Sequence, residues 1–180
     1  MLELPKILLI LDLDETLIYS SEHELEREAD FKVGSYFTYK RPHLEAFLEM
    51  CFEHFEVGVW TAGTEDYASE IVRQVFGTRV LKFFWTRERC TVRYFEDIGE
   101  RIYTKPLAKV RKLGFHLERV IAVDDVAENY HDAYGNLVQV RKYLGDSSDT
   151  ELLRLGQYLP HLASKPNVRK LEKRRWRDSI

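Results

Sequence analysis

The sequence has few cysteines and no long hydrophobic run. The first shortage argues against disulfide-stabilised and zinc-binding proteins, and the second against membrane-spanning proteins. Its two cysteines, Cys51 and Cys90, are not spaced like zinc ligands and form no disulfide framework, so we expect a reducing compartment. No stretch approaches the about 20 apolar residues of a membrane-spanning helix. The short N-terminal apolar run leads into two aspartates, which argues against a signal peptide. We therefore expect a cytoplasmic protein, or a nuclear one in a eukaryote, that does not enter a membrane.

The totals of the chain fit one globular domain. With 180 residues, 44% of them hydrophobic and 32% charged, the chain is long enough for a single sizeable core. We predict one domain over residues 1–180, acting as a monomer, without internal repeats or low-complexity linkers. The net charge is −3, but residues 165–180 carry seven Lys or Arg against two acids. This basic tail could bind nucleic acid or an acidic partner, or it could be a solvated helix end.

The first predicted strand ends in two acids. Residues 7–11 form a continuous apolar run, which is typical of a strand buried on both faces of a parallel sheet. Asp12 and Asp14 follow the run, and Thr16 comes two residues later. Ligands of open parallel sheets bind just beyond the carboxyl ends of the strands. Two partly buried carboxylates need a compensating cation or hydrogen bonds, although these three polar residues could also be only the caps of a helix.

A second apolar strand, over residues 119–123, also ends in two acids, Asp124 and Asp125. A calcium-binding loop does not explain the first pair, because the positions that would need Gly and Glu hold Leu17 and His23. One Mg²⁺ held by acids from two neighbouring strand ends explains both pairs. A carboxylate nucleophile beside a carboxylate that transfers protons is the arrangement of enzymes that form an aspartyl phosphate.

Two further segments could bind phosphate near these acids. Residues 56–60 predict a buried strand that ends at Thr61 and Ala62, where a hydroxyl and backbone amides can approach a phosphate oxygen. Lys105 comes directly before Pro106 at a predicted helix start, where it could offset negative charge during phosphoryl transfer. Each feature alone has a structural alternative: Thr64, at the end of the same segment, could be only a helix cap, and Lys105 could be a solvated side chain.

The remaining pattern alternates helices and strands, with one interruption. Residues 31–40 predict a strand or hairpin near the site, after a loop that begins at Ser20. Residues 80–104 hold three short segments of β character, which we interpret as a small antiparallel insert. The insert could wall off a substrate site or be only a structural hairpin. Ser148 and Glu151 are spaced as a capping box for the last helix. Apolar spacing predicts helices over residues 44–55, 67–76, 107–113 and 152–162.

These segments together resemble the four signatures of the haloacid dehalogenase superfamily in order and spacing. The signatures are matched by Asp12-x-Asp14-x-Thr16, Thr61, Lys105 and Asp124-Asp125. Further motifs are similar to the small C-terminal-domain and nuclear-LIM-interactor-factor-like phosphatases: DLDETL, Arg41-Pro42, WTAG, Tyr67-Ala68, RERC and residues 149–153. The resemblance covers about residues 6–170. It implies an α/β fold, a haloacid dehalogenase-like Rossmannoid parallel sheet flanked by helices.

The resemblance also implies a role for each matched residue. Asp12 would be the nucleophile, and Asp14 the general acid and then the general base. The implied phosphate ligands are Thr61, Ala62 and Lys105. The implied Mg²⁺ ligands are Asp12, Asp14 through its backbone carbonyl, Asp125, and Asp124 either directly or through a neighbouring ligand.

A Mg²⁺-dependent phosphatase for phosphomonoesters is therefore expected, with phosphoserine or phosphothreonine proteins or peptides as substrates. Two departures leave the substrate open. Relatives acting on the polymerase tail usually have Asp-Asn where this chain has Asp124-Asp125, and Asp where it has Pro106. The alternatives are a phosphatase for nucleic-acid ends or small metabolites, and a non-catalytic peptide-binding scaffold with the same fold.

Overall fold

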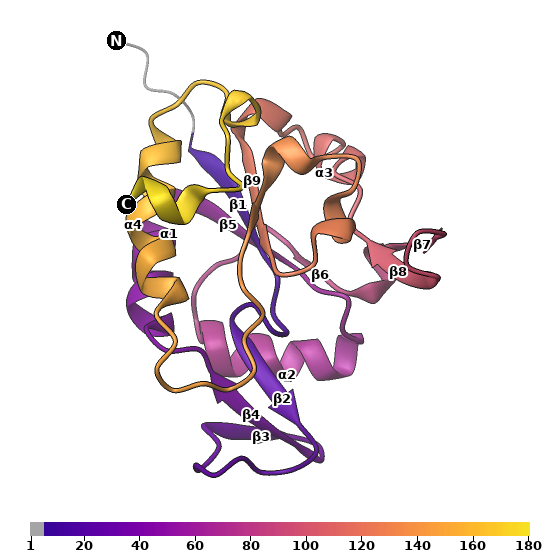
Figure 1. The fold of residues 1–180 in the computed structure, drawn as a ribbon, viewed down its shortest axis with the longest axis vertical. Helices are drawn as coiled ribbons and strands as arrows, with labels where there is room; N and C mark the ends of the chain where they lie inside the picture. The colour runs from indigo at the N-terminus through magenta and orange to yellow at the C-terminus, as the bar shows by residue number, and fades with distance from the viewer. Residues whose placement is uncertain (1–5) are drawn as a thin grey trace.

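Strand β1 (Ile7–Leu11) lies at the centre of a parallel sheet in the computed structural model, which describes residues 6–180. The sheet has five strands in the order β10-β9-β1-β5-β6 (Figure 1). The other strands are β5 (Phe55–Trp60), β6 (Phe84–Trp85), β9 (Val120–Asp124) and β10 (Leu137–Gln139). Each neighbouring pair is parallel, so the carboxyl ends of all these strands lie along one edge.

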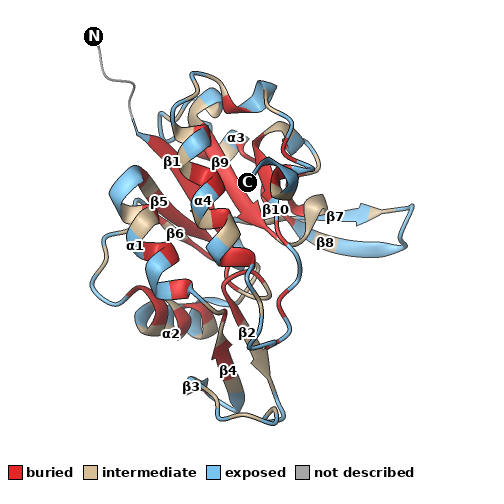
Figure 2. Ribbon diagram, turned by 60° about the vertical axis from the view of Figure 1, so that its left-hand side comes forward, coloured by how far each residue is buried: buried red, intermediate tan, exposed pale blue. Residues whose placement is uncertain are grey.

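Both faces of the sheet are covered, as the continuous apolar run of β1 predicts. All side chains of β1 are fully buried. Ile7, Leu9 and Leu11 belong to a core with α1 (Leu44–His54), α2 (Glu65–Phe76) and α4 (Glu151–Ala163). Leu8 and Ile10 face the opposite core, which includes residues of and next to the short helix α3 (Ala108–Arg111). Figure 2 shows the buried strands behind α1 and α4. None of the helices within residues 6–180 is both long and apolar enough to cross a bilayer.

Two antiparallel elements flank the main sheet. Strands β2 (Ile18–Ser21), β3 (Phe31–Val33) and β4 (Tyr36–Lys40) form a sheet in the order β2-β4-β3. This confirms the hairpin predicted over residues 31–40, but β2 includes Ser20 and Ser21, where we expected a loop. Strands β7 (Thr91–Phe95) and β8 (Glu100–Thr104) form a hairpin that projects from the body (Figures 1 and 2).

The antiparallel part of residues 80–104 begins only at Thr91, because the first β segment belongs to the main sheet. Strand β6 pairs in parallel with β5, matching Trp60 with Trp85. The ring of Phe83 lies against Gly58, where a Cβ atom would be only 2.7 Å from the ring. A glycine therefore makes room for this aromatic packing. The alternation of apolar residues cannot show which sheet such a short strand joins.

The predicted capping box of α4 is wrong. The helix begins at Glu151, and its first amide donates to Oδ1 of Asp149 at 2.9 Å, while Ser148 bonds to Asp146. The carboxylate of Glu151 is turned to the backbone amide of Arg141 and to Arg177. These distant partners outcompete the local bond that the sequence spacing suggests.

The basic tail is not a solvated helix end. It holds two 3-10 turns, η5 (Val168–Lys170) and η6 (Trp176–Ser179), and the side chains of Val168 and Trp176 are fully buried. The indole of Trp176 donates to the carbonyl of Gln139 at 2.9 Å, so the segment is anchored on the edge strand β10. The other 3-10 turns are η1 (Arg87–Arg89), η2 (Leu117–Arg119), η3 (Ala127–Tyr130) and η4 (Tyr134–Asn136).

A buried ion pair ties the residue after β4 to the chain before α4. The guanidinium of Arg41 is 1% exposed and makes a two-point contact with Asp149, at 2.9 and 2.8 Å. It also donates to the carbonyls of Thr16 and Arg141. Although partial burial opposes the effect, hydrogen bonds from Arg41 and the amide of Glu151 hold the pKa of Asp149 below its usual value.

We expect Asp149→Asn to lower the free energy of unfolding by about 3 kcal/mol at pH 7, because it leaves a buried guanidinium without a counter-ion. Since folding lowers the pKa of Asp149, its contribution is present above the ordinary value of 3.8 and is lost as the pH falls further. Urea unfolding of both proteins between pH 7 and pH 3 measures this difference. The exposed Asp146→Asn is the control and should lose much less; a difference independent of pH would contradict the assignment.

Candidate active site

The ends of β1 and β9 bring three carboxylates together. The two strands pair Leu11 with Val123, so Asp12 leaves the sheet beside Asp124 and Asp125. The amide of Asp12 donates to the carbonyl of Val123 at 3.1 Å, which fixes this register beyond the last strand pair. One carboxylate oxygen from each aspartate lies within 4.8 Å of the others. One acid of the first pair and both acids of the second thus form one cluster.

Lys105 is the counter-charge inside the cluster. Its side chain is fully buried, and Nζ lies 2.6 Å from Oδ1 of Asp12 and 2.5 Å from Oδ2 of Asp124. The residue follows β8, and its backbone amide donates to the carbonyl of Asn129. The ammonium is therefore held between two strand ends by the backbone around it and by two carboxylates.

Asp124 has the most hydrogen-bond partners of the three acids. It is fully buried and accepts hydrogen bonds from Nδ2 of Asn129, the amide of Val126 and Lys105. Asp125 is more open, and its Oδ1 accepts a bond of 3.3 Å from the hydroxyl of Thr16. This bond places Thr16 in a supporting role. Asp12 and Asp125 line a cavity of about 690 Å³, which leaves them accessible to a ligand.

The cluster holds more negative charge than its surroundings neutralise. Burial raises the pKa of Asp12 well above its usual value, and repulsion by Asp124 and Asp125 adds to burial against the opposing effect of Lys105. Burial and the neighbouring Asp124 and Glu15 raise the pKa of Asp125 to about 6. Burial alone would lower the pKa of Lys105, but Asp12 and Asp124 outweigh it and raise the pKa well above the usual value.

The donor set fits a bound Mg²⁺. Hard carboxylate oxygens are the ligands that this ion takes, and the oxygens of Asp12, Asp124 and Asp125 are close enough together to share one cation. Three ionised acids and the ammonium of Lys105 leave two negative charges, which a divalent cation balances. The carboxylate of Asp14 is not part of this group.

Asp14 lies apart from the cluster but on the same cavity. The hydroxyl of Tyr67 in α2 donates to its Oδ1 at 2.5 Å and lies 2.7 Å from Oγ of Ser20 in β2. Burial raises the pKa of Asp14, and the bond from Tyr67 opposes this rise. The next residue, Glu15, has φ 61°, a left-handed conformation uncommon for a side-chain-bearing residue, which turns the chain sharply after Asp14. The two aspartates of the first motif are thus held in different surroundings.

The loop after β5 forms another wall of the cavity. Thr61 is almost fully buried, and its hydroxyl accepts a hydrogen bond of 2.9 Å from the amide of Gly63. Ala62 and Gly63 line the cavity together with Arg87, whose Nε donates to the carbonyl of Ala62 at 2.7 Å. The loop therefore presents small residues and backbone beside Asp12, which a phosphate group can approach closely.

The projecting hairpin also contributes to the cavity. Arg101 and Tyr103 of β8 are among its lining residues, and the guanidinium of Arg87 lies 4.9 Å from the centre of the Tyr103 ring. Of the two interpretations of the insert, a wall of the substrate site is the one that this position supports. Two cationic side chains, Arg87 and Arg101, stand at the entrance to an acidic centre.

Two residues that contact the predicted site were not identified from the sequence as parts of it. In the sequence, Tyr67 stands out only as part of a family motif at the start of a predicted helix, and Asn129 does not stand out. Tyr67 bonds to Asp14, which lies 53 residues away in the sequence, and Asn129 bonds to Asp124. Local sequence patterns do not show that these side chains meet. Two signals were available for Tyr67: its place in the motif Tyr67-Ala68 and its hydroxyl on an otherwise apolar helix face.

Comparison with known proteins assigns this arrangement to a family. The model of the NLI interacting factor-like phosphatase family matches residues 7–169. "CTD small phosphatase-like protein 2" of Dictyostelium discoideum is 29% identical over 178 residues, covering 92% of this chain and 29% of that protein. "CTD nuclear envelope phosphatase 1" of Xenopus tropicalis is 31% identical over 177 residues, covering 89% of this chain and 69% of that protein. The chain thus spans less than a third of the first relative and about two thirds of the second.

Solved structures show the same fold. Fission yeast Fcp1, an RNA polymerase II CTD phosphatase, superimposes with a TM-score of 0.57 at 22% identity, covering 84% of this chain and 49% of that one. A haloacid dehalogenase-like hydrolase of Bacteroides fragilis gives 0.51 at 13% identity, covering 83% and 93%. The predicted fold class and the predicted phosphatase family are confirmed. The chain belongs to the NLI interacting factor-like phosphatase family and has its haloacid dehalogenase-like fold.

Proposed function

We propose that this chain is a Mg²⁺-dependent phosphatase that hydrolyses phosphomonoesters through a phosphoryl group carried on Asp12. The observation that supports this most is the position of Asp12. It lines the cavity, bonds to the buried Lys105, and lies within reach of Asp124 and Asp125. A carboxylate held between a cation and a cation-binding cluster can stay ionised, as a nucleophile must.

In the first step, a carboxylate oxygen of Asp12 attacks phosphorus as the bond between phosphorus and the ester oxygen breaks. Asp14 donates its proton to the departing oxygen, which leaves as an alcohol or phenol. Its raised pKa suits this role, since a carboxylic acid must be protonated to act as the donor. The backbone at Thr61 and Ala62 and the ammonium of Lys105 stabilise negative charge on the transferring group.

In the second step, water attacks the phosphorus of the aspartyl phosphate. Asp14, now ionised, takes a proton from this water, and the bond between phosphorus and Asp12 breaks to release phosphate. Tyr67 keeps Asp14 in one position through both steps by its hydrogen bond of 2.5 Å. Bound to Asp12, Asp124 and Asp125, and to the backbone of Asp14, Mg²⁺ would supply further positive charge against the phosphoryl oxygens.

The proposed substrate is a phosphoserine or phosphothreonine side chain of a protein. The cavity is bordered by a projecting hairpin and is open to a macromolecule, and the relatives' names include phosphatases of the RNA polymerase II CTD. We keep the single domain over residues 1–180 and the monomeric state as predictions. Phosphate release from para-nitrophenyl phosphate and from phosphoserine peptides, with Mg²⁺ and with EDTA, tests the proposal directly. No release from any of them would refute it in favour of a peptide-binding scaffold.

We expect Mg²⁺ to stabilise the folded protein independently of turnover. At about a hundredfold excess over its dissociation constant, a ligand specific for the folded state adds about 2.7 kcal/mol, or about 5–10 °C in melting temperature for a chain of this size. The Asp125→Asn variant should lose most of this shift, because it removes one of the carboxylates of the cluster. Melting curves with Mg²⁺ and with EDTA measure both proteins; an unchanged shift in the variant would remove Asp125 from the metal site.

A further inference from the structure

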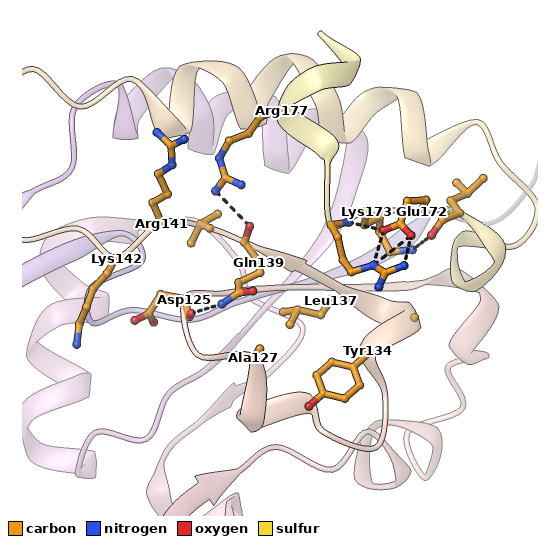
Figure 3. A pocket seen from close by; sticks show the side chains of 14 residues that line it. Asp125, Ala127, Tyr134, Leu137, Gln139, Arg141, Lys142, Glu172, Lys173 and Arg177 are labelled. Atoms are coloured by element: carbon orange, nitrogen blue, oxygen red, sulfur yellow. Dashed lines mark hydrogen bonds and ion pairs between the residues drawn. The ribbon is translucent and has the colours of Figure 1, made fainter. Parts of the chain in front are cut away.

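A second cavity, of about 940 Å³, lies along the edge strand β10 (Figure 3). One side is formed by β10 and the residues after it, and the other by the segment of residues 171–177 that is anchored through Trp176. Ala127, Leu137 and Val140 contribute apolar surface. We call this cavity the β10 groove. We define it by the amide and cationic side chains that line it, Gln139, Arg141, Lys142, Lys173, Arg174 and Arg177.

The groove is cationic. Five Lys or Arg side chains line it, against the two acids Asp125 and Glu172. This contrasts with the chain as a whole, whose net charge is −3. Three of the five cations also pair with acids, Lys142 with Glu15, Arg174 with Glu172 and Arg177 with Glu151. Arg141 and Arg174 are exposed, so a ligand that enters the groove can reach both, in competition with Glu172 at Arg174. A local excess of one sign on a protein of the other sign favours a ligand of complementary charge.

Lys173 places a buried positive charge in the lining of the β10 groove. Its side chain is only 5% exposed, although it lines the groove. The ammonium donates to two backbone carbonyls, of Val168 at 2.5 Å and of Leu171 at 2.8 Å. An ammonium has three donors, so one remains for a further acceptor. A buried cation that donates to two neutral carbonyls is costly unless an anion approaches it.

The groove adjoins the proposed catalytic centre, because Asp125 lines both cavities. A chain whose phosphorylated residue reaches Asp12 can therefore extend into the groove with its neighbouring residues. The volume of about 940 Å³ is near the upper limit of small-molecule pockets, which suits a stretch of polypeptide.

A polypeptide fits the groove better than a nucleic acid does. Proteins that bind single strands present several aromatic rings on which successive bases stack, whereas Tyr134 is the sole aromatic residue among those lining this groove. The apolar floor of Leu137, Val140 and Leu171 suits aliphatic parts of a peptide.

We propose that the β10 groove binds an acidic segment of the phosphoprotein substrate, adjacent in sequence to the residue that is dephosphorylated. This inference rests on the proposed phosphatase function. Glu, Asp or a second phosphorylated side chain next to the target residue would lie against Arg141, Lys173 and Arg174. The groove then determines which phosphorylated sites are preferred, while small phosphate esters do not use it.

The test compares two peptides with the same phosphoserine, one flanked by Glu and the other by Gln, and para-nitrophenyl phosphate as a third substrate. The Arg141→Glu/Arg174→Glu double variant reverses two exposed groove charges. Arg111→Glu/Lys112→Glu, at two exposed positions that line neither cavity, carries the same change in net charge and is the control. We expect the groove variant to raise KM for the Glu peptide about tenfold, or about 1.4 kcal/mol, with kcat unchanged.

The other substrates separate the possible failures. With the Gln peptide and with para-nitrophenyl phosphate, the KM of the groove variant should differ from that of the unmodified protein by less than about twofold. The KM of the control variant should differ by no more than this with all three substrates. Equal losses for the Glu and Gln peptides, or an equal effect of the control variant, would overturn the groove assignment. If a 5′-phosphorylated oligonucleotide rather than the Glu peptide showed the loss, the groove would serve nucleic acid and the proposal would be wrong. If the unmodified protein hydrolysed none of these substrates, the phosphatase function itself would fail.

Discussion

Asp12→Asn is expected to lower the rate of phosphate release by about 10⁴-fold or more, the scale seen when a nucleophile is removed from other hydrolases. An amide has almost the same shape as a carboxylate, and its oxygen can still accept the bond from Lys105, which is 2.6 Å long in the unmodified chain. The fold is therefore retained while the ionised oxygen that would attack phosphorus is lost. Release of phosphate from para-nitrophenyl phosphate and from a phosphoserine peptide, both with Mg²⁺, measures the effect.

A measurement of folding stability distinguishes the loss of the nucleophile from misfolding of the variant. Burial raises the pKa of Asp12, which means that its ionised form destabilises the fold, so in EDTA the Asn variant should be at least as stable as the unmodified protein. Asp66→Asn, at an exposed position in the first turn of α2, is the matched control and should retain full activity. A fully active Asp12→Asn protein would exclude Asp12 as the nucleophile.

Lys105→Met is expected to lower the free energy of unfolding in EDTA by about 3–5 kcal/mol, the cost of leaving buried charges without their partner. The ammonium is fully buried between Asp12 and Asp124, and methionine fills similar volume without the charge. Activity should fall by about 10²–10³-fold, since a positive charge on the transferring group is also lost. Urea unfolding with and without Mg²⁺, and phosphate release with Mg²⁺, measure the two effects.

The pH dependence identifies the cause of this loss. In the variant, the carboxylates of Asp12 and Asp124 lose the ammonium between them, and burial raises the pKa of Asp12 already in the unmodified chain, where Lys105 opposes the rise. An acid with a raised pKa destabilises the fold when ionised, and removal of the ammonium raises the pKa of Asp12 further, so the loss of stability relative to the unmodified protein should shrink as the pH falls from 8. Lys109→Met, which removes a bond to the carbonyl of Arg89, is the control and should show no such recovery. A loss below about 1 kcal/mol, or one independent of pH, would contradict the ion-pair account.

The sequence predicts the parts of the site that lie at strand ends. Two apolar runs that stop at acids, over residues 7–12 and 119–125, predict that these acids meet, because parallel strands end at one edge. The structure brings Asp12, Asp124 and Asp125 together as expected. The continuous apolar runs were sufficient here because such runs are typical of strands buried on both faces of a parallel sheet, as both strands are.

The remaining contacts depend on the packing of distant segments. The bond from Tyr67 to Asp14, the membership of β6 in the main sheet and the anchoring of the tail through Trp176 each join residues that no local pattern relates. The capping box of Ser148 and Glu151 failed for the same reason, because Arg141 and Arg177 compete for the carboxylate. Sequence patterns describe an element and its buried face, whereas partners across the fold need the coordinates.

The phosphoryl group on Asp12 can be sought directly. Asp14→Asn should slow the hydrolysis of the aspartyl phosphate more than its formation from a substrate with a good leaving group, such as para-nitrophenyl phosphate. Mixing this variant with that substrate and Mg²⁺, followed by acid quenching and mass spectrometry of peptides, should show one phosphoryl group on Asp12, removable by hydroxylamine. The double variant Asp12→Asn/Asp14→Asn should show none. A phosphoryl group on another residue, or turnover with no phosphorylated protein at any time, would contradict the account.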